Sequence, residues 1–243
     1  MYAVGQGTMI GMVSRTSSPA SGAPGTADGP TVGFDLDMTL IDSRPGIHAA
    51  YVELAARTGA HIDADLAVTR LGPPLTEELA HWFAPDEVPA MADLYRSLYP
   101  RFAVPPTLPM PGAREAVAAV RETGGRAVVV TAKHEGNAKL HLEHLDIHPD
   151  AVIGELWAEG KAEALTAHGA SAYVGDHVGD VRGARTAGVV SVAVATGPCS
   201  AGELRAAGAD TVLPDLTAFP AWLATHRTPR TPQGSQGSQG RQD

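Results

Sequence analysis

The chain has 243 residues, of which 44% are hydrophobic, and a formal net charge of −9. This length is enough for one large or two small domains with a full hydrophobic core. The acidic balance argues against a nucleic-acid partner, because a phosphate backbone is held by clustered Lys and Arg. The single cysteine, Cys199, cannot form an internal disulfide, so nothing indicates an oxidising compartment.

The two ends of the chain lack the periodicity of packed elements. Residues 1–30 are rich in Gly, Ser, Ala, Thr and Pro, and residues 227–243 repeat Gly-Ser-Gln. Both segments are predicted to be disordered. The sequence has no apolar run long enough to cross a bilayer, and its start does not resemble a signal peptide. We therefore expect a cytoplasmic protein with no membrane partner.

Between these segments, short β-branched runs alternate with helical patterns. Runs typical of buried parallel strands occupy residues 31–36, 126–131, 171–174, 189–194 and 210–213. Helical patterns occupy residues 113–123, 137–146, 161–168, 178–187 and 201–207. This alternation predicts the α/β class, with a Rossmann-like three-layer core around a parallel sheet.

Residues 44–110 interrupt the alternation. They contain four helical patterns, at residues 51–58, 66–70, 77–83 and 87–101, and no strand-like run. We predict an all-helical domain inserted after the first strand. The α/β core domain would then consist of residues 31–43 and 111–226.

Polar side chains collect where predicted strands end or helices begin. They are Asp35, Asp37, Thr131, Lys161, Asp176 and Asp180. Open α/β sheets build their sites at the carboxyl ends of the strands, so we expect these residues to converge. Converging carboxylates repel one another unless a divalent cation joins them, and Mg²⁺ prefers oxygen ligands. Asp35, Asp176 and Asp180 are therefore candidate Mg²⁺ ligands, and Lys161 and the Thr131 hydroxyl would face a phosphoryl group.

This set of motifs resembles the haloacid dehalogenase-like superfamily over residues 32–225. Asp35, Asp37 and Thr39 match its Asp-x-Asp-x-Thr motif, and Thr131 matches its Ser or Thr at a strand end. Its third and fourth motifs, a Lys and an acidic pair, are matched by Lys161 and by Asp176 with Asp180. Within the superfamily, the segment Phe34–Ser43 looks most like phosphoglycolate phosphatase-like enzymes, although Met38 replaces the usual Gly.

The resemblance implies a role for each matched residue. Asp35 would be the nucleophile that becomes an aspartyl phosphate, and Asp37 the acid and then the base. Asp35, the Asp37 carbonyl and Asp176 would bind Mg²⁺, with Asp180 supporting the ion. Thr131, Ala132 and Lys161 would hold the phosphoryl group. The expected reaction is hydrolysis of a small phosphorylated metabolite, with phosphoglycolate as one candidate.

The resemblance also implies that residues 44–110 form a cap domain that selects substrates. Its segment Arg70–Leu75 resembles the cap loop that reaches the active site, and Lys133 occupies a position that could face the substrate. A substrate carboxylate would need an arginine, and the candidates near or within the cap are Arg44, Arg70, Arg96 and Arg101.

The same scaffold also supports other functions. A sugar-phosphate mutase would use the same Asp pair, and a non-catalytic protein could retain the fold; both alternatives stay open. A 2-haloacid dehalogenase needs neither an acid at position 37 nor a magnesium cage, so Asp37, Asp176 and Asp180 argue against it. A phosphonate hydrolase of this superfamily uses a cap lysine, and residues 44–110 contain none.

A group of histidines could suggest zinc, since two of them lie one helical turn apart. These histidines are His134, His141, His144 and His148. Neither Cys nor a carboxylate pattern completes such a site, so we interpret the group as a solvated helix face.

Overall fold

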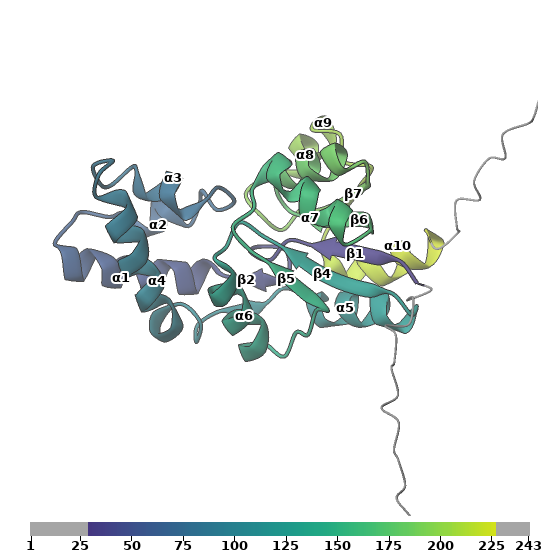
Figure 1. Cartoon of the computed structure of the whole chain (residues 1–243), viewed down its shortest axis with the longest axis horizontal. Coiled ribbons are helices and arrows are strands. Elements are labelled where there is room, and N and C mark those ends of the chain that lie inside the picture. The colour runs from purple at the N-terminus through teal and green to yellow at the C-terminus, as the bar shows by residue number, and fades with distance from the viewer. Residues whose placement is uncertain (1–28, 227–243) are drawn as a thin grey trace, which may run out of the picture.

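A six-stranded parallel sheet organises most of the protein (Figure 1). The computed structural model describes residues 29–226, so the disorder predicted at the two ends falls almost entirely outside the described residues. The strands lie in the order β5-β4-β1-β6-β7-β8. Their bounds are β1 Thr31–Phe34, β4 Arg126–Val130, β5 Ala151–Ile153, β6 Ala170–Gly175, β7 Val190–Val194 and β8 Thr211–Leu213.

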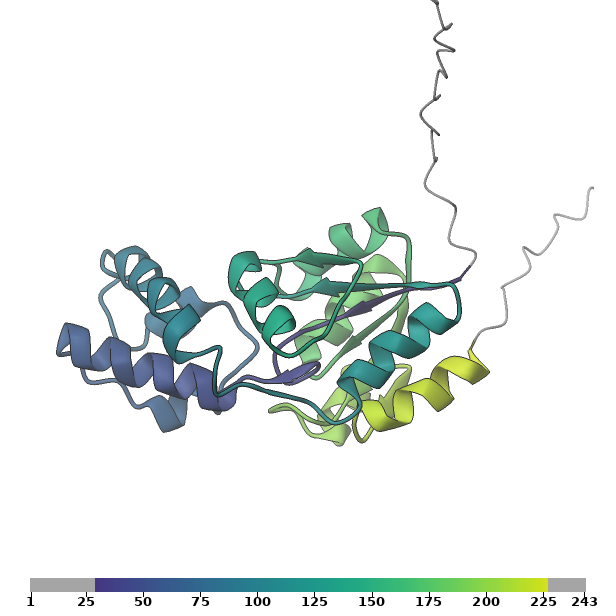
Figure 2. The ribbon, with the colours of Figure 1, turned by 90° about the horizontal axis from the view of Figure 1, so that it is seen from below.

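Helices cover both faces of the sheet (Figures 1 and 2). One face carries α5 (Ala113–Glu122), α6 (Glu135–His144) and α10 (Phe219–Thr225), which share one apolar cluster with β1. The other face carries α7 (Lys161–Ala167), α8 (Val178–Ala187) and α9 (Ala201–Ala206). The predicted Rossmann-like three-layer α/β core is confirmed.

Strand β1 shows how the sequence sorts its side chains between these two layers. Phe34 packs edge-on against Phe219 of α10, with ring centroids 5.3 Å apart. Gly33 faces the opposite layer, where an added Cβ would lie 2.6 Å from Leu165 and 2.8 Å from Tyr173. Glycine is needed here because Tyr173 fills the space beside the strand, and this tyrosine is also part of the site described below.

Four helices form a separate group beside the sheet (Figure 1). They are α1 (Arg44–Thr58), α2 (Ala64–Ala67), α3 (Leu75–Leu79) and α4 (Val88–Phe102), and they bury a hydrophobic cluster of their own. Tyr95 of α4 lies between Tyr51 and Tyr99, with ring centroids 4.9 and 5.4 Å away. Helices α1 and α4 approach closely at Gly46, where an added Cβ would lie 2.0 Å from the carbonyl oxygen of Ala103.

The chain enters and leaves this helical group through a short two-stranded ribbon. Strand β2 (Ile41–Asp42) pairs antiparallel with β3 (Leu108–Pro109). The expectation that residues 44–110 lack any strand is therefore wrong at their end, because two residues of β3 close the ribbon. A two-residue pairing leaves no periodic signal in the sequence.

Two other elements were not predicted. Strand β5 is only three residues long and half-buried at the sheet edge, so it carries no strong β pattern. Helix α10 begins at Phe219 with Pro220 in its first turn, where proline is well tolerated. Helix α1 begins at Arg44, seven residues before the predicted helical pattern, and Pro45 occupies its first turn.

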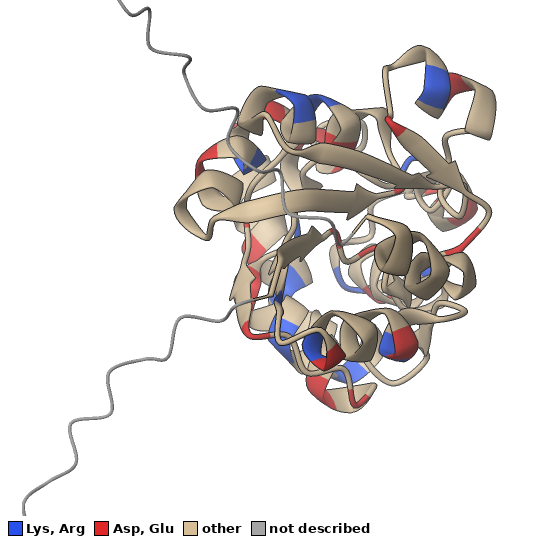
Figure 3. Ribbon diagram, turned by 90° about the vertical axis from the view of Figure 1, so that its right-hand side faces the viewer, with Lys and Arg blue, Asp and Glu red and all other residues tan. Residues whose placement is uncertain are grey.

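Within residues 29–226, no helix combines the length and apolar character that a membrane span requires. Lys and Arg are interspersed with Asp and Glu over the helices in view in Figure 3.

Candidate active site

The loop after β1 places two carboxylates at the carboxyl end of the sheet. The backbone N–H of Asp35 donates to the carbonyl oxygen of Val174, at 2.8 Å, which holds this residue against β6. The loop then turns tightly: the N–H of Met38 donates to the carbonyl of Ile41 at 2.8 Å, and Met38 adopts a φ of 60°. This left-handed conformation favours glycine, which explains why the enzymes that this segment resembles usually have glycine at this position. The loop keeps its turn with methionine.

Three aspartates converge beside this loop. Asp35, Asp176 and Asp180 each offer an oxygen within 4.8 Å of the others, and all three residues are buried. Asp176 follows β6 and accepts the Thr39 hydroxyl at 2.7 Å. Asp180 lies in the first turn of α8, and its second oxygen accepts the backbone N–H of His177 at 3.0 Å. Asp176 and Asp180 are therefore each oriented by a hydrogen bond of their own.

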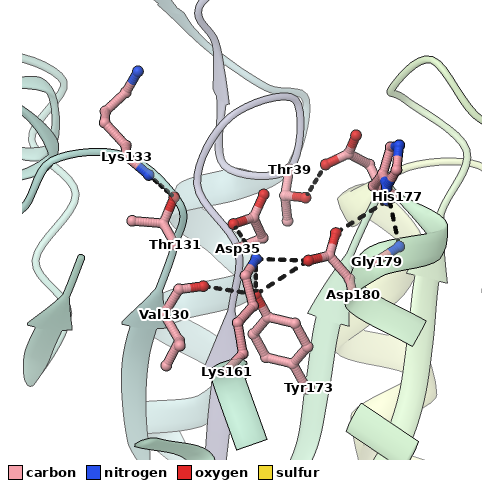
Figure 4. A network of polar contacts seen from close by, with 11 residues as sticks. Asp35, Thr39, Val130, Thr131, Lys133, Lys161, Tyr173, His177, Gly179 and Asp180 are labelled. Atoms are coloured by element: carbon pink, nitrogen blue, oxygen red, sulfur yellow. Dashed lines mark hydrogen bonds and ion pairs between the residues drawn. The ribbon is translucent and has the colours of Figure 1, made fainter. Parts of the chain in front are cut away.

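Lys161 is the cation at the centre of this cluster (Figure 4). Its side chain is 1% exposed, and Nζ lies 2.9 Å from Asp35 Oδ1 and 2.7 Å from Asp180 Oδ1. It also donates to the Tyr173 hydroxyl at 2.8 Å, which in turn donates to the carbonyl of Val130 at 2.6 Å. Tyr173 was not predicted as a site residue, because its position in β6 looks like any other buried strand position.

The electrostatics of the cluster favour a bound cation. Burial, together with repulsion from Asp180 and Asp37, raises the pKa of Asp35 to about 7 despite the attraction of Lys161. Burial first and repulsion from Asp180 and Asp35 next raise the pKa of Asp176 well above its ordinary value. One lysine does not balance three buried carboxylates, so the oxygen-only donor set fits a divalent ion such as Mg²⁺.

The second carboxylate of the loop, Asp37, has a different partner. Its Oδ1 lies 2.9 Å from Nζ of Lys133. Burial acts to raise the pKa of Asp37, but the Lys133 ammonium and Ser43 outweigh it and the pKa is lowered. Lys133 also donates to the Tyr99 hydroxyl at 2.6 Å. Figure 4 shows the Lys133 side chain pointing away from the cluster around Lys161.

A cavity of about 270 Å³ opens between the sheet and the helical group. Asp35, Asp37 and Thr131 line it on the sheet side, together with Ala132 and Lys133. Thr131 follows β4, and its hydroxyl accepts the backbone N–H of Lys133 at 3.2 Å. The structure thus places all the residues expected at the phosphoryl site within one buried cluster or along the cavity wall above it.

The four candidate arginines differ in their surroundings. Arg70 lines the cavity but makes a two-pronged ion pair with Glu78, at 3.0 and 2.5 Å. Arg96 also lines the cavity, and its buried Nε has no hydrogen-bond partner among the described residues. Arg44 pairs with Asp42, while Arg101 lies over the ring of Phe102. Arg96 also pairs with Asp93 at 3.3 Å, but of the two arginines that line the cavity it is the one with a buried Nε that has no partner among the described residues.

The interpretation of the histidine group as a solvated helix face is wrong for His141. This residue is 0% exposed, and its ring meets the Tyr99 ring edge-on at 5.3 Å. Burial and the nearby Lys133 lower its pKa to about 3. The error arises because α4 packs against α6, and the sequence of α6 alone does not reveal that contact. His144 and His148 are exposed, as expected.

The comparisons with known proteins agree with this geometry. A model of the haloacid dehalogenase-like hydrolase family matches residues 32–185. This chain belongs to that family. Phosphoglycolate phosphatase from Caulobacter vibrioides is 28% identical over 222 residues, which cover 79% of this chain and 90% of that protein.

A second relative is PpaX of Caldanaerobacter subterraneus subsp. tengcongensis, named as a pyrophosphatase. It is 31% identical over 182 residues, covering 66% of this chain and 79% of PpaX. The crystal structure of a predicted phosphatase from Clostridium acetobutylicum superposes with a TM-score of 0.71 at 24% identity, covering 81% of this chain and 99% of that one. The predicted class, a haloacid dehalogenase-like phosphatase, is confirmed.

Proposed function

We propose that this hydrolase is a Mg²⁺-dependent phosphatase that acts on a small phosphomonoester through an aspartyl phosphate on Asp35. The observation that carries the proposal is the buried cluster of Asp35, Asp176, Asp180 and Lys161, of which Asp35 also lines the cavity. Uncatalysed hydrolysis of phosphate monoesters is among the slowest known reactions, so the enzyme must lower the barrier by roughly 20 kcal/mol. Charge placed around the phosphoryl oxygens supplies much of that reduction.

In the proposed reaction, an Asp35 oxygen attacks phosphorus and the bond from phosphorus to the leaving oxygen breaks. The leaving oxygen takes a proton from the protonated form of Asp37, a minor form at neutral pH because Lys133 lowers the pKa of this carboxyl group. Water then attacks phosphorus, gives a proton to Asp37, and releases inorganic phosphate and the free Asp35 carboxylate. Lys161, Thr131 and the backbone at Ala132 would hold the phosphoryl oxygens. Mg²⁺, held by Asp35, the Asp37 carbonyl and Asp176 with support from Asp180, would neutralise the charge of the transferring group.

The size and lining of the cavity support a small substrate. About 270 Å³ lies below the usual range for drug-sized ligands, which is roughly 300–1,000 Å³. The similarity to a phosphoglycolate phosphatase and the free donor of Arg96 both favour a short leaving group that carries a carboxylate. We propose residues 44–110 as a cap domain that contributes this selectivity, and the cytoplasm as the site of action.

The test is Mg²⁺-dependent release of phosphate, first from an aryl phosphate and then from a panel of phosphorylated metabolites. Asp35→Asn should abolish release at every Mg²⁺ concentration. Retained activity in that variant would show that Asp35 is not the nucleophile. Incubation with a hexose 1-phosphate, followed by product analysis, separates hydrolysis from the mutase alternative, because a mutase forms an isomeric phosphate. A protein that releases no phosphate from any panel member would favour the non-catalytic alternative.

A further inference from the structure

One polar contact joins the helical group directly to the acid of the proposed reaction. Tyr99 of α4 accepts a hydrogen bond from Lys133 at 2.6 Å, and Lys133 pairs with Asp37 at 2.9 Å. The ammonium also lies 4.7 Å from the centre of the Tyr99 ring. The three side chains come from the helical group, the loop after β4 and the loop after β1, so the contact forms only when these parts lie together.

Tyr99 and Lys133 are both held in place by neighbouring groups. Tyr99 is 2% exposed, and its ring is packed between Tyr95 and His141, with centroids 5.4 and 5.3 Å away. The backbone of Lys133 is fixed by its bond to Thr131 and by the N–H of Glu155, which donates to the Lys133 carbonyl at 3.0 Å. A Tyr99 hydroxyl and a Lys133 ammonium held this way have little freedom to move away from the Asp37 carboxylate.

We propose that Tyr99 and Lys133 are positioning residues for Asp37. In this arrangement the Tyr99 hydroxyl fixes the Lys133 ammonium, and the ammonium fixes the Asp37 carboxyl group where it can serve the leaving oxygen. Proton transfer in a transition state requires heavy atoms within about 3 Å, so a small displacement of Asp37 would slow the reaction. The inference rests on the proposed phosphatase function and makes acid catalysis dependent on contact with α4.

A direct role for Lys133 in binding substrate is the competing explanation. The Lys133 ammonium already has two partners, because it donates to the Tyr99 hydroxyl and forms an ion pair with Asp37. An ion pair between α4 and the sheet side is that of Arg96 with Glu155, 3.9 Å apart and partly exposed. Exposed pairs of that length contribute little, so the buried Tyr99 contact is the stronger connection.

The experiment compares kcat/KM for two aryl phosphates whose leaving groups differ in acidity. Phenyl phosphate expels a basic phenolate that needs a proton, whereas 2,4-dinitrophenyl phosphate expels a stable anion that does not. The constant kcat/KM reports on steps up to departure of the leaving group, so later hydrolysis of the phosphoenzyme does not obscure the comparison. The variants are Tyr99→Phe, Lys133→Met and the double variant, each tested with saturating Mg²⁺.

We expect Tyr99→Phe to lower kcat/KM for phenyl phosphate about tenfold and that for 2,4-dinitrophenyl phosphate less than twofold. We also expect the double variant to be no slower than Lys133→Met alone, because the hydroxyl acts through the ammonium. Lys139→Met is the matched control for Lys133, since Lys139 is exposed on α6 and pairs only with Glu135 among the described residues. Thermal melts verify that each variant is folded.

Equal losses on both substrates, or additive losses in the double variant, would overturn the positioning role. A rise in KM that is the same for both substrates in Lys133→Met would instead assign that lysine to substrate binding. If the wild-type protein releases phosphate from neither substrate, the proposed function itself fails, and that outcome differs from every result that concerns Tyr99 alone.

Discussion

The Nζ atom of Lys161 lies 2.9 Å from Oδ1 of Asp35, although the two residues are 126 positions apart in the sequence. This contact joins the first helical residue of α7 to the end of the central strand. Because the lysine is almost fully buried, its charge is not screened by water, and the pair orients the proposed nucleophile toward the cavity.

Replacement of Lys161 is expected to remove both activity and stability. Lys161→Met leaves the buried carboxylates of Asp35 and Asp180 without their cation, and breaking a buried pair in this way costs about 3–5 kcal/mol. The free energy of unfolding, measured in urea without metal, should fall by that amount, and phosphate release should fall at least a thousandfold. Lys139→Met, on the exposed face of α6, should change the unfolding free energy by less than about 1 kcal/mol. Similar losses in both variants would contradict this account.

Metal binding is expected to stabilise the wild-type protein through the acid cluster. Mg²⁺ at about 100 times its dissociation constant should raise the free energy of unfolding by about 2.7 kcal/mol. Asp176→Asn should abolish this increase, because it removes a ligand. Without metal, the same variant should be at least as stable as the wild type, since burial and repulsion from Asp180 and Asp35 raise the pKa of Asp176. Thermal melts with EDTA and with Mg²⁺ check both parts, and a Mg²⁺-induced increase that persists in Asp176→Asn would contradict the metal site.

The buried imidazole of His141 is expected to make the protein less stable in acid. Its pKa is lowered to about 3 by burial, against an ordinary value of 6.5, so between these values the unfolded chain binds the additional proton. Stability should therefore fall as pH decreases from about 6.5, by at most about 1.4 kcal/mol per pH unit for this group. His141→Phe should show a shallower acid dependence than the wild type in urea unfolding between pH 4 and 7. His144→Phe, at an exposed position of the same helix, serves as the control. Equal slopes in all three proteins would exclude His141 as the cause.

Arg96 is expected to select carboxylate-bearing substrates. A hydrogen bond to a charged group contributes about 1.5–3 kcal/mol, so Arg96→Gln should lower the ratio of kcat/KM for phosphoglycolate to that for ethyl phosphate by about tenfold or more. Arg70→Gln should change this ratio less than twofold, because Glu78 already engages the Arg70 guanidinium. Arg101→Gln is a control outside the cavity wall. If Arg70→Gln changed this ratio and Arg96→Gln did not, the selectivity would be assigned to the loop at residues 70–75 instead.

The sequence was sufficient to predict the α/β core and the residues that converge at its site. Asp35, Thr131 and Asp176 were predictable because each follows an apolar strand, and strand ends of a parallel sheet meet at one edge. Lys161 was predictable because it falls where the resembling family has its third motif, in a chain with only three lysines. Each of these signals lies in a short stretch of sequence, and the topology of the parallel sheet brings the residues together.

The contacts of Tyr99, His141 and Tyr173 could not be predicted in the same way. Each depends on how one element packs against another: α4 on α6 for the first two, and β6 against Lys161 for the third. Apolar spacing on a single helix or strand does not distinguish a tyrosine that packs from one that also binds an ammonium. The ion pair of Arg70 with Glu78 spans eight residues and joins the segment after α2 to α3, beyond the reach of helical spacing rules.

The most direct test of the account is to identify the phosphorylated residue. Rapid acid quenching during turnover with Mg²⁺ and an aryl phosphate, followed by borohydride reduction and peptide mass spectrometry, converts an aspartyl phosphate to homoserine at its position. The account predicts homoserine at position 35 in the wild-type protein and at no position in Asp35→Asn. Reduction at a different aspartate, or steady phosphate release with position 35 unmodified throughout, would contradict it.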